Sequence, residues 1–132
     1  MSDRYVYIDT SAFMKLITPE AETAALQRYL ASRPLRVSSA LLRTEALRAA
    51  MRVSQDHVGA VRRQLRNVAL MSIDREVLER AGGLRPADLR SLAAIHLAAA
   101  LSLGDELDDV VTYDSRMFAA ATAQGLNAVS PA

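Results

Sequence analysis

Short apolar runs and longer stretches with apolar residues at helical spacing alternate along this chain. The short runs are rich in β-branched and aromatic residues, which is typical of buried strands. They are Val6-Tyr7-Ile8, Leu35-Arg36-Val37, Val68 to Ile73, Asp109 to Thr112 and Ala128-Val129. The stretches between them predict helices, one starting after Asp9 and others over residues 18–31, 38–53, 54–67, 74–82, 89–103 and 114–124.

Capping residues set several of the predicted helix starts. Thr18 followed by Pro19 is typical of the first turn of a helix. Ser38 or Ser39 is expected to cap the helix that follows the second strand. Asp88 stands where an N-cap belongs in the apolar helix LRSLAAIHLAAAL.

Strands that alternate with helices predict an α/β fold. We expect one domain over residues 1–132, with a mainly parallel sheet of four to five strands flanked by helices. Ligands of such sheets bind beyond the carboxyl ends of the strands, at the point where the strand order reverses. Asp9 follows the first strand and Asp114 follows the fourth, so both are expected at that edge.

Composition narrows the class of protein. The 132 residues are 51% hydrophobic, as in an ordered protein with a buried core, and include no cysteine, which excludes a thiolate zinc site. The longest mainly apolar run, residues 92–103, is too short to cross a membrane. The first ten residues lack the basic segment and apolar core of a signal peptide. These features predict a cytoplasmic protein.

Charge is distributed unevenly although the net charge is only +1. Residues 28–66 hold nine arginines against two acids, a net charge of +7, whereas the segments before and after are net acidic. A basic segment beside an acidic remainder indicates a polyanion held near a carboxylate site. Arg62, Arg63 and Arg66 are our candidates for contacts to the phosphates of that polyanion.

Three acids are candidates for a functional site. Taken singly, Asp9 and Asp114 could each be a helix N-cap. Glu45 could be the exposed partner of Arg48, three residues later. Taken together, the three lie on elements that converge at one edge of the sheet. Clustered carboxylates without cysteine suit Mg²⁺ or Mn²⁺, and such an ion suits phosphodiester hydrolysis.

Other classes of enzyme or signalling domain fit the sequence less well. A receiver-like domain needs a lysine late in the chain, but the only lysine is Lys15. A haloacid-dehalogenase-type phosphatase needs a second Asp where Ser11 stands. No glycine-rich phosphate loop or Gly-x-Ser-x-Gly elbow is present, and His57 is expected at the surface.

Four segments together resemble a known family. They are VYIDTSAFMKL, LLRTEALRA, LRSLAAIHLAAAL and VVTYDSRM, and in this order they are similar to a PIN domain, more narrowly to the VapC ribonuclease toxins of bacterial toxin–antitoxin pairs. The resemblance implies a Mg²⁺-dependent endoribonuclease. It also implies that Asp9, Glu45 and Asp114 are family acids, with Thr10 or Ser11 as the accompanying hydroxyl.

This chain departs from the family pattern at one position. The family helix normally reads L-D-A-x-H-L-A and its Asp is a principal metal ligand, whereas this chain has Ala93 there. Asp88 is not a substitute, because five residues along a helix is about 140° around its axis. His96 matches the family histidine and is expected to be a contact of the buried helix. The intact remainder of the pattern favours a deliberate Asp→Ala inactivation over natural decay.

The resemblance also implies substrate and partners. We expect cleavage of structured RNA, tRNA or ribosomal RNA, and neutralisation by a VapB-type antitoxin. The family implies a homodimer that forms a heterotetramer or larger assembly with the antitoxin, away from any membrane. The alternative is a natural non-catalytic PIN-like binding module, which Ala93 leaves open.

Overall fold

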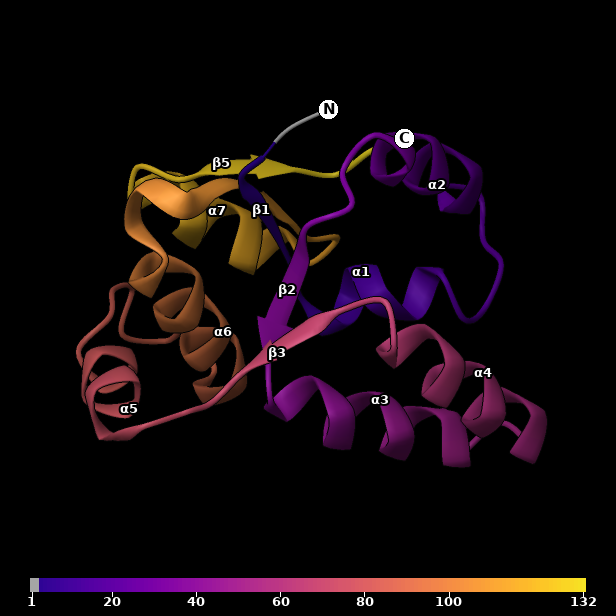
Figure 1. Cartoon of the computed structure of the whole chain (residues 1–132). Coiled ribbons are helices and arrows are strands. Elements are labelled where there is room, and N and C mark those ends of the chain that lie inside the picture. Colours follow the sequence, from indigo (N-terminus) through magenta and orange to yellow (C-terminus); the bar gives the residue numbers. More distant parts are fainter. Residues whose placement is uncertain (1–2) are drawn as a thin grey trace.

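Five short strands form one parallel sheet in the computed structural model, which describes residues 3–132 (Figure 1). The strands are β1 (Tyr5–Ile8), β2 (Arg36–Ser39), β3 (Ala69–Met71), β4 (Leu107–Val111) and β5 (Asn127–Val129). They lie in the order β3-β2-β1-β4-β5, and every neighbouring pair is parallel. The predicted α/β class with a parallel, helix-flanked sheet is therefore confirmed.

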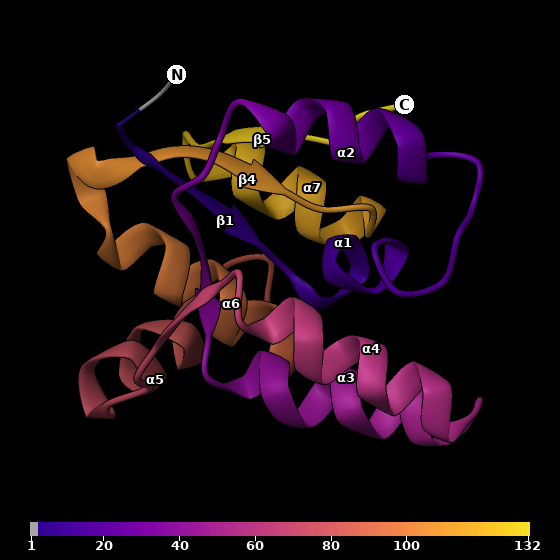
Figure 2. The ribbon, with the colours of Figure 1, turned by 45° about the vertical axis from the view of Figure 1, so that its right-hand side comes forward.

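Helices connect the strands and cover both faces of the sheet. They are α1 (Thr10–Lys15), α2 (Thr23–Ala31), α3 (Leu41–Met51), α4 (Gln55–Leu65), α5 (Arg75–Gly82), α6 (Ser91–Ser102) and α7 (Ser115–Ala123), with a 3₁₀ turn, η1 (Gly104–Glu106), before β4. Helices α3 and α4 run side by side as a hairpin in both views of the ribbon (Figures 1 and 2). Within residues 3–132, no helix is both long and apolar enough to span a lipid bilayer.

Alternation along the central strand divides the core between the two faces. Val6 and Ile8 of β1 pack with buried residues of α1, α2, α3 and α4. Tyr7 points to the other face, among buried residues of α5, α6 and α7. Side chains of a strand alternate between faces, so one four-residue strand contributes to both halves of the core.

The strand order reverses beside β1. From β1 the chain builds the sheet outward through β2 and β3, then returns to add β4 and β5 on the other side. This arrangement leaves a crevice beyond the carboxyl ends of β1 and β4, where α/β sheets bind their ligands.

Helix α2 has Glu22 at its N-cap position, four residues later than the predicted N-cap Thr18. The Thr23 hydroxyl accepts from the Glu20 backbone N–H at 2.9 Å and donates to the Lys15 carbonyl at 2.8 Å. The Lys15 ammonium pairs with Glu20 and Glu22 at 2.8 and 3.1 Å. These bonds fold the segment back onto the end of α1, so Thr18 is not an N-cap.

Two other predicted caps are also wrong. Ser38 and Ser39 are buried residues of β2 and pair with β3, so they do not cap α3, which has no side-chain cap. Asp88 lies outside the cap of α6, because Arg90 holds the N-cap position, without a side-chain bond. For the two serines, pairing with β3 outweighed the local preference for a cap, whereas Asp88 lies in a turn closed by the bond from the Leu89 N–H to the Pro86 carbonyl at 3.0 Å.

Candidate active site

Asp9 is a buried carboxylate at the junction of β1 and α1. It caps α1, with Oδ1 accepting from the Ala12 backbone N–H at 3.0 Å and from the Ser11 hydroxyl at 2.6 Å. Oδ2 accepts from the Thr112 hydroxyl at the end of β4. Only 5% of the residue is exposed, and this burial raises the pKa of the Asp9 carboxyl despite the three bonds that favour its ionised form.

Glu45 lies on α3 and pairs with His96 of α6. A carboxylate can only accept, so the imidazole Nε2–H donates to Glu45 Oε1, at 2.8 Å. Thr10 Oγ1 lies 3.2 Å from the same Nε2, and the Tyr7 hydroxyl lies 2.7 Å from Nδ1. Only 4% of the His96 side chain and 20% of the Glu45 side chain are exposed. The observed partner of Glu45 is therefore His96, and not Arg48 as in the alternative considered from the sequence.

Asp114 follows β4 and caps α7. Its Oδ1 accepts from the backbone N–H groups of Arg116 and Met117 at 2.9 and 3.2 Å. Its own N–H donates to the Thr112 hydroxyl at 3.1 Å, so one threonine contacts both Asp9 and Asp114. The capping roles predicted for Asp9 and Asp114 are confirmed, and both side chains also line the pocket described next.

One small pocket joins these residues beyond the carboxyl ends of β1 and β4. Its volume is about 170 Å³, and its lining includes Asp9, Glu45, Ala93 and Asp114, which come from four different parts of the fold. The fold therefore brings together the three predicted acids and the alanine in their midst. Among residues 3–132, however, no group of three or more acidic or histidine side chains is close enough to hold a metal ion. The described side chains around this pocket therefore fall short of a three-residue metal-binding cluster.

The two hydroxyl candidates also lie at this pocket. Ser11 donates to Asp9 and accepts from the Tyr113 backbone N–H at 2.9 Å, so it ties α1 to the end of β4. Thr10 contacts His96 instead. Ser11 therefore acts on Asp9, and Thr10 acts on the Glu45–His96 pair.

Sequence reasoning missed two polar residues of the pocket lining, His96 and Arg90. His96 was expected to be only a contact of the buried helix, yet it contacts Glu45 directly. Arg90 was not a candidate at all, yet it lines the pocket with Ala93. The signal was available, because residues three apart on a helix lie on the same face and Arg90 precedes Ala93 by three.

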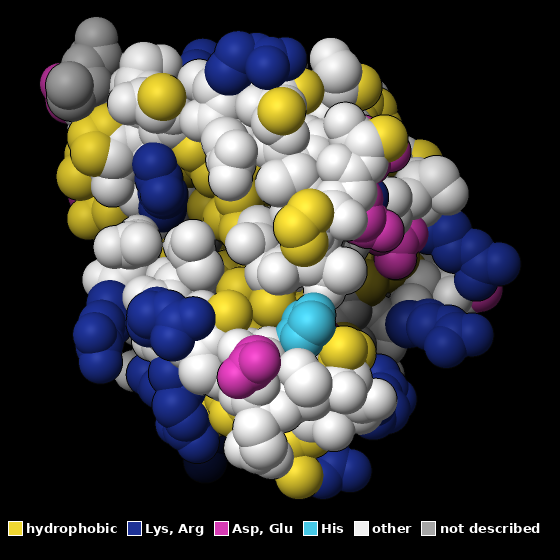
Figure 3. Space-filling model, turned by 90° about the vertical axis from the view of Figure 1, so that its right-hand side faces the viewer, with side chains coloured by type: hydrophobic (Ala, Val, Ile, Leu, Met, Phe, Trp, Pro, Cys, Tyr) yellow, Lys and Arg dark blue, Asp and Glu magenta, His cyan; other side chains and the backbone are white. Residues whose placement is uncertain are grey.

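The arginine candidates lie elsewhere. Arg62, Arg63 and Arg66 are exposed at the end of α4, and none of them lines the carboxylate pocket. Figure 3 shows that Lys and Arg side chains on one face gather mostly in its lower half, at the height of α3 and α4 in Figure 1.

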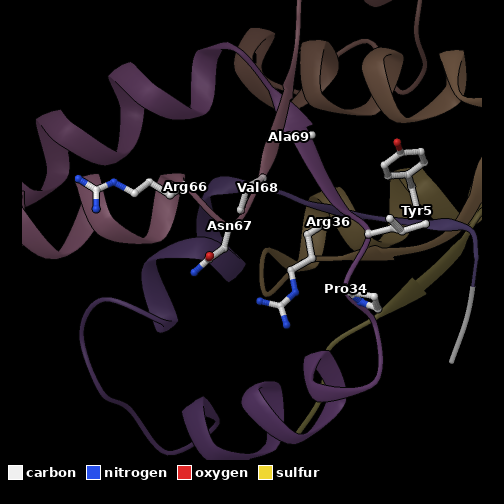
Figure 4. A pocket seen from close by; sticks show the side chains of 8 residues that line it. Tyr5, Pro34, Arg36, Arg66, Asn67, Val68 and Ala69 are labelled. Atoms are coloured by element: carbon white, nitrogen blue, oxygen red, sulfur yellow. The ribbon is translucent and has the colours of Figure 1, made fainter.

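Another hollow lies at the starts of the strands, away from the acids. It has a volume of about 580 Å³, and Arg66 and Arg36 are among its lining residues (Figure 4). Arg36 donates from Nε and Nη2 to the carbonyls of Arg33 and Leu30 at 3.0 and 2.8 Å. The Arg36 side chain therefore hydrogen-bonds the carbonyl groups at the C-terminal end of α2.

Comparison with known sequences gives consistent results along nearly the whole chain. The PIN domain family model matches residues 6–123. Ribonuclease VapC46 of Mycobacterium tuberculosis is 46% identical over 126 residues, which cover 96% of this chain and 97% of that protein. Ribonuclease VapC35 of the same organism is 40% identical over 130 residues, which cover 96% of each.

Comparison with solved structures concerns the fold alone, because the sequence identities are low. Mycobacterium tuberculosis VapC20, described as a Sarcin-Ricin loop cleaving toxin, superposes with a TM-score of 0.75 at 19% identity, over 96% of this chain and 99% of that one. A toxin–antitoxin complex from Klebsiella pneumoniae gives a TM-score of 0.74 at 23% identity, over 96% and 98%. The same parallel sheet with helices on both faces is thus present in these proteins.

Proposed function

The chain belongs to the PIN-domain family and, within it, to the VapC ribonucleases, and from this membership we propose that its carboxylate pocket is the cleavage site of an endoribonuclease toxin. The observation that carries the proposal is the convergence of Asp9, Glu45 and Asp114 on one pocket at the point where the strand order reverses. The substrate class we propose is structured RNA, tRNA or ribosomal RNA.

PIN-domain ribonucleases generally use divalent metal ions, and we propose Mg²⁺, with Mn²⁺ as a substitute, for this one. Such an ion supplies a water of lowered pKa and neutralises charge on the phosphate. Asp9 and Asp114 are the proposed ligands, and Glu45 the proposed ligand or the residue that orients the attacking water. Asp9 is held in place by three hydrogen bonds and Glu45 by His96, so both carboxylates are fixed before any ligand arrives.

These proposed ligand roles apply to the form of the toxin with an acid at position 93, because without that acid the donor set is incomplete for a tightly held ion. The described residues contain no cluster of three potential ligands, and the Ala93 methyl group stands at the pocket where a fourth carboxylate would enter. We propose that Ala93 replaces a metal-binding Asp and that the chain is an inactivated form of the toxin.

Further proposals concern the remaining candidates and the partners. Arg62, Arg63 and Arg66 are proposed to contact RNA phosphates at a distance from the cut, and Thr10 and Ser11 to position the acids and the substrate. Structures of the same fold include a toxin–antitoxin complex from Klebsiella pneumoniae and a DNA-bound VapBC from Salmonella typhimurium. We propose a VapB-type antitoxin as partner of this chain as well, with a homodimer of single-domain chains as the toxin unit, acting in the cytoplasm.

The experiment that tests this function restores the missing acid. Ala93→Asp should cleave tRNA or ribosomal RNA in the presence of Mg²⁺ and absence of antitoxin, whereas the present chain should not. Without Mg²⁺ the variant should melt at a lower temperature than its parent, because a fourth carboxylate adds like charge to the pocket. With Mg²⁺ the order should reverse, since binding to the folded state stabilises it.

A matched control adds the same charge elsewhere. Ala24→Asp lies at an exposed position of α2, outside the pocket, and should show neither the metal-dependent reversal nor cleavage. If Ala93→Asp cuts no RNA and melts like its parent with and without Mg²⁺, position 93 is outside the site. The incomplete ligand set would then favour the second candidate, a natural PIN-like binding module without catalysis.

A further inference from the structure

Three adjoining hollows form one groove that starts at the carboxylate pocket. The second hollow, of about 370 Å³, shares Arg90, Ala93 and Asp114 with that pocket. The third, of about 390 Å³, shares Leu89 and Arg116 with the second. Because each hollow has lining residues in common with the next, the three adjoin between the start of α6 and α7, and we call them together the α6–α7 groove.

Two guanidinium groups stand along the middle of the α6–α7 groove. Arg90 immediately precedes α6, Arg116 lies in the first turn of α7, and both are exposed. Within the described part of the chain, neither side chain forms an ion pair with an acid or a hydrogen bond with an acceptor. Of the acids that line the second and third hollows, Asp114 is committed through Oδ1 to capping α7, and Asp88 lies at the outer end. The two cations are thus available to a ligand.

The far end of the α6–α7 groove is mostly apolar. Pro86 and three alanines of α7 line it, with Arg116 at its inner side and Asp88 beside it. The alanines are Ala119, Ala120 and Ala123. Small apolar side chains leave room for a flat group and offer it no hydrogen bond. The groove therefore presents, in order, carboxylates, two cations and an apolar floor.

We propose that the α6–α7 groove binds the RNA strand on one side of the cleaved bond, with Arg90 and Arg116 on its phosphates and a base over the alanines of α7. The inference rests on the proposed ribonuclease function. Three carboxylates repel a polyanion, so a strand that enters their pocket needs compensating cations next to it, and guanidinium groups bind phosphate with two parallel bonds. A groove that takes one strand selects an unpaired segment, such as a loop, over a duplex.

The test measures RNA binding by the chain as it stands, which is not expected to cut the probe. The probe is a fluorescein-labelled RNA stem–loop, followed by fluorescence anisotropy over a series of salt concentrations. In the double variant Arg90→Gln, Arg116→Gln, the slope of log K against log salt should become less negative by about 1.4. This change corresponds to two fewer phosphates neutralised on single-stranded RNA. The affinity should fall about tenfold for each arginine, as for other hydrogen bonds to charged groups.

A matched control removes two exposed arginines away from the groove. Arg28→Gln, Arg75→Gln changes the net charge by the same amount on α2 and α5, and should leave the slope within error of the parent. A second pair tests the apolar end: Ala119→Glu should weaken binding of the stem–loop, and Ala24→Glu, at an exposed position of α2, should not. The stem without its loop should bind more weakly than the stem–loop, and its affinity should be the same for the parent and for the groove variants.

The outcomes separate the groove from the enzyme. If the Arg90 and Arg116 variant binds RNA with the affinity and slope of the control pair, the groove does not hold RNA and the inference is wrong. Weakened binding of an antitoxin by that variant, with RNA binding unchanged, would also overturn it and assign the groove to a protein segment. If the Arg90 and Arg116 variant loses RNA binding but Ala93→Asp does not cut RNA, the groove is an RNA-binding site and the proposed ribonuclease function is wrong.

Discussion

The coupling free energy between Glu45 and His96 can be measured by a double-mutant cycle. The perturbations are Glu45→Gln, His96→Gln and the two together, compared by urea unfolding in the absence of divalent ions. Because the cycle isolates the term shared by the two side chains, repulsion between Glu45 and the other carboxylates cancels from the result.

The size of the coupling follows from the geometry. A 2.8 Å bond from an almost fully buried imidazole to a carboxylate is a hydrogen bond to a charged group, a class that contributes about 1.5–3 kcal/mol. One fifth of the Glu45 side chain is exposed, so water screens part of the interaction and the lower end, about 1.5 kcal/mol, is expected. The alternative partner, Arg48, would give an exposed helix pair worth about 0.2–0.5 kcal/mol.

A second cycle, with Glu45→Gln and Arg48→Gln, is the matched control and should give a coupling close to zero. If the Glu45–His96 coupling is below about 0.5 kcal/mol, the pair is no stronger than an exposed one and the assignment of His96 to hold Glu45 is refuted. If instead the Arg48 cycle gives the larger coupling, Glu45 faces solvent and does not belong to the pocket.

Two further predictions concern charge at and away from the pocket. Asp9→Asn should stabilise the fold near neutrality, because burial raises the pKa of the Asp9 carboxyl and the ionised form is disfavoured in the folded state. The gain should be smallest below the unfolded pKa of about 3.9, grow between that value and the raised folded pKa, and level off above it, so urea unfolding that shows a gain independent of pH would contradict it. Replacing Arg62, Arg63 and Arg66 together with Ala should weaken RNA binding and reduce its salt slope by roughly one for each phosphate that an arginine no longer neutralises. Unchanged affinity and slope would make the three ordinary surface residues.

Most of the fold could be predicted from the sequence because its determinants are local. Short β-branched runs such as Val6-Tyr7-Ile8 form strands, and their alternation with amphipathic segments imposes a parallel sheet. Asp9 and Asp114 could be placed at one edge of that sheet because each follows the end of a strand. In contrast, Thr18 and Ser38 failed as caps, because bonds from the Thr23 hydroxyl to the end of α1 and pairing of β2 with β3 decided those segments.

The tertiary structure alone decided which side chains meet. Glu45 has an arginine three residues later on its own helix, and only the tertiary fold gives it His96 of α6, 51 positions away, as its partner. The α6–α7 groove likewise joins Arg90 and Arg116, which lie on different elements and share no sequence motif. Sequence spacing decides the neighbours of a residue along one helix or strand, whereas neighbours across elements depend on how the faces of the sheet are covered. For this reason the sequence determined the sheet and two acids at its edge, and the tertiary structure determined what those acids touch.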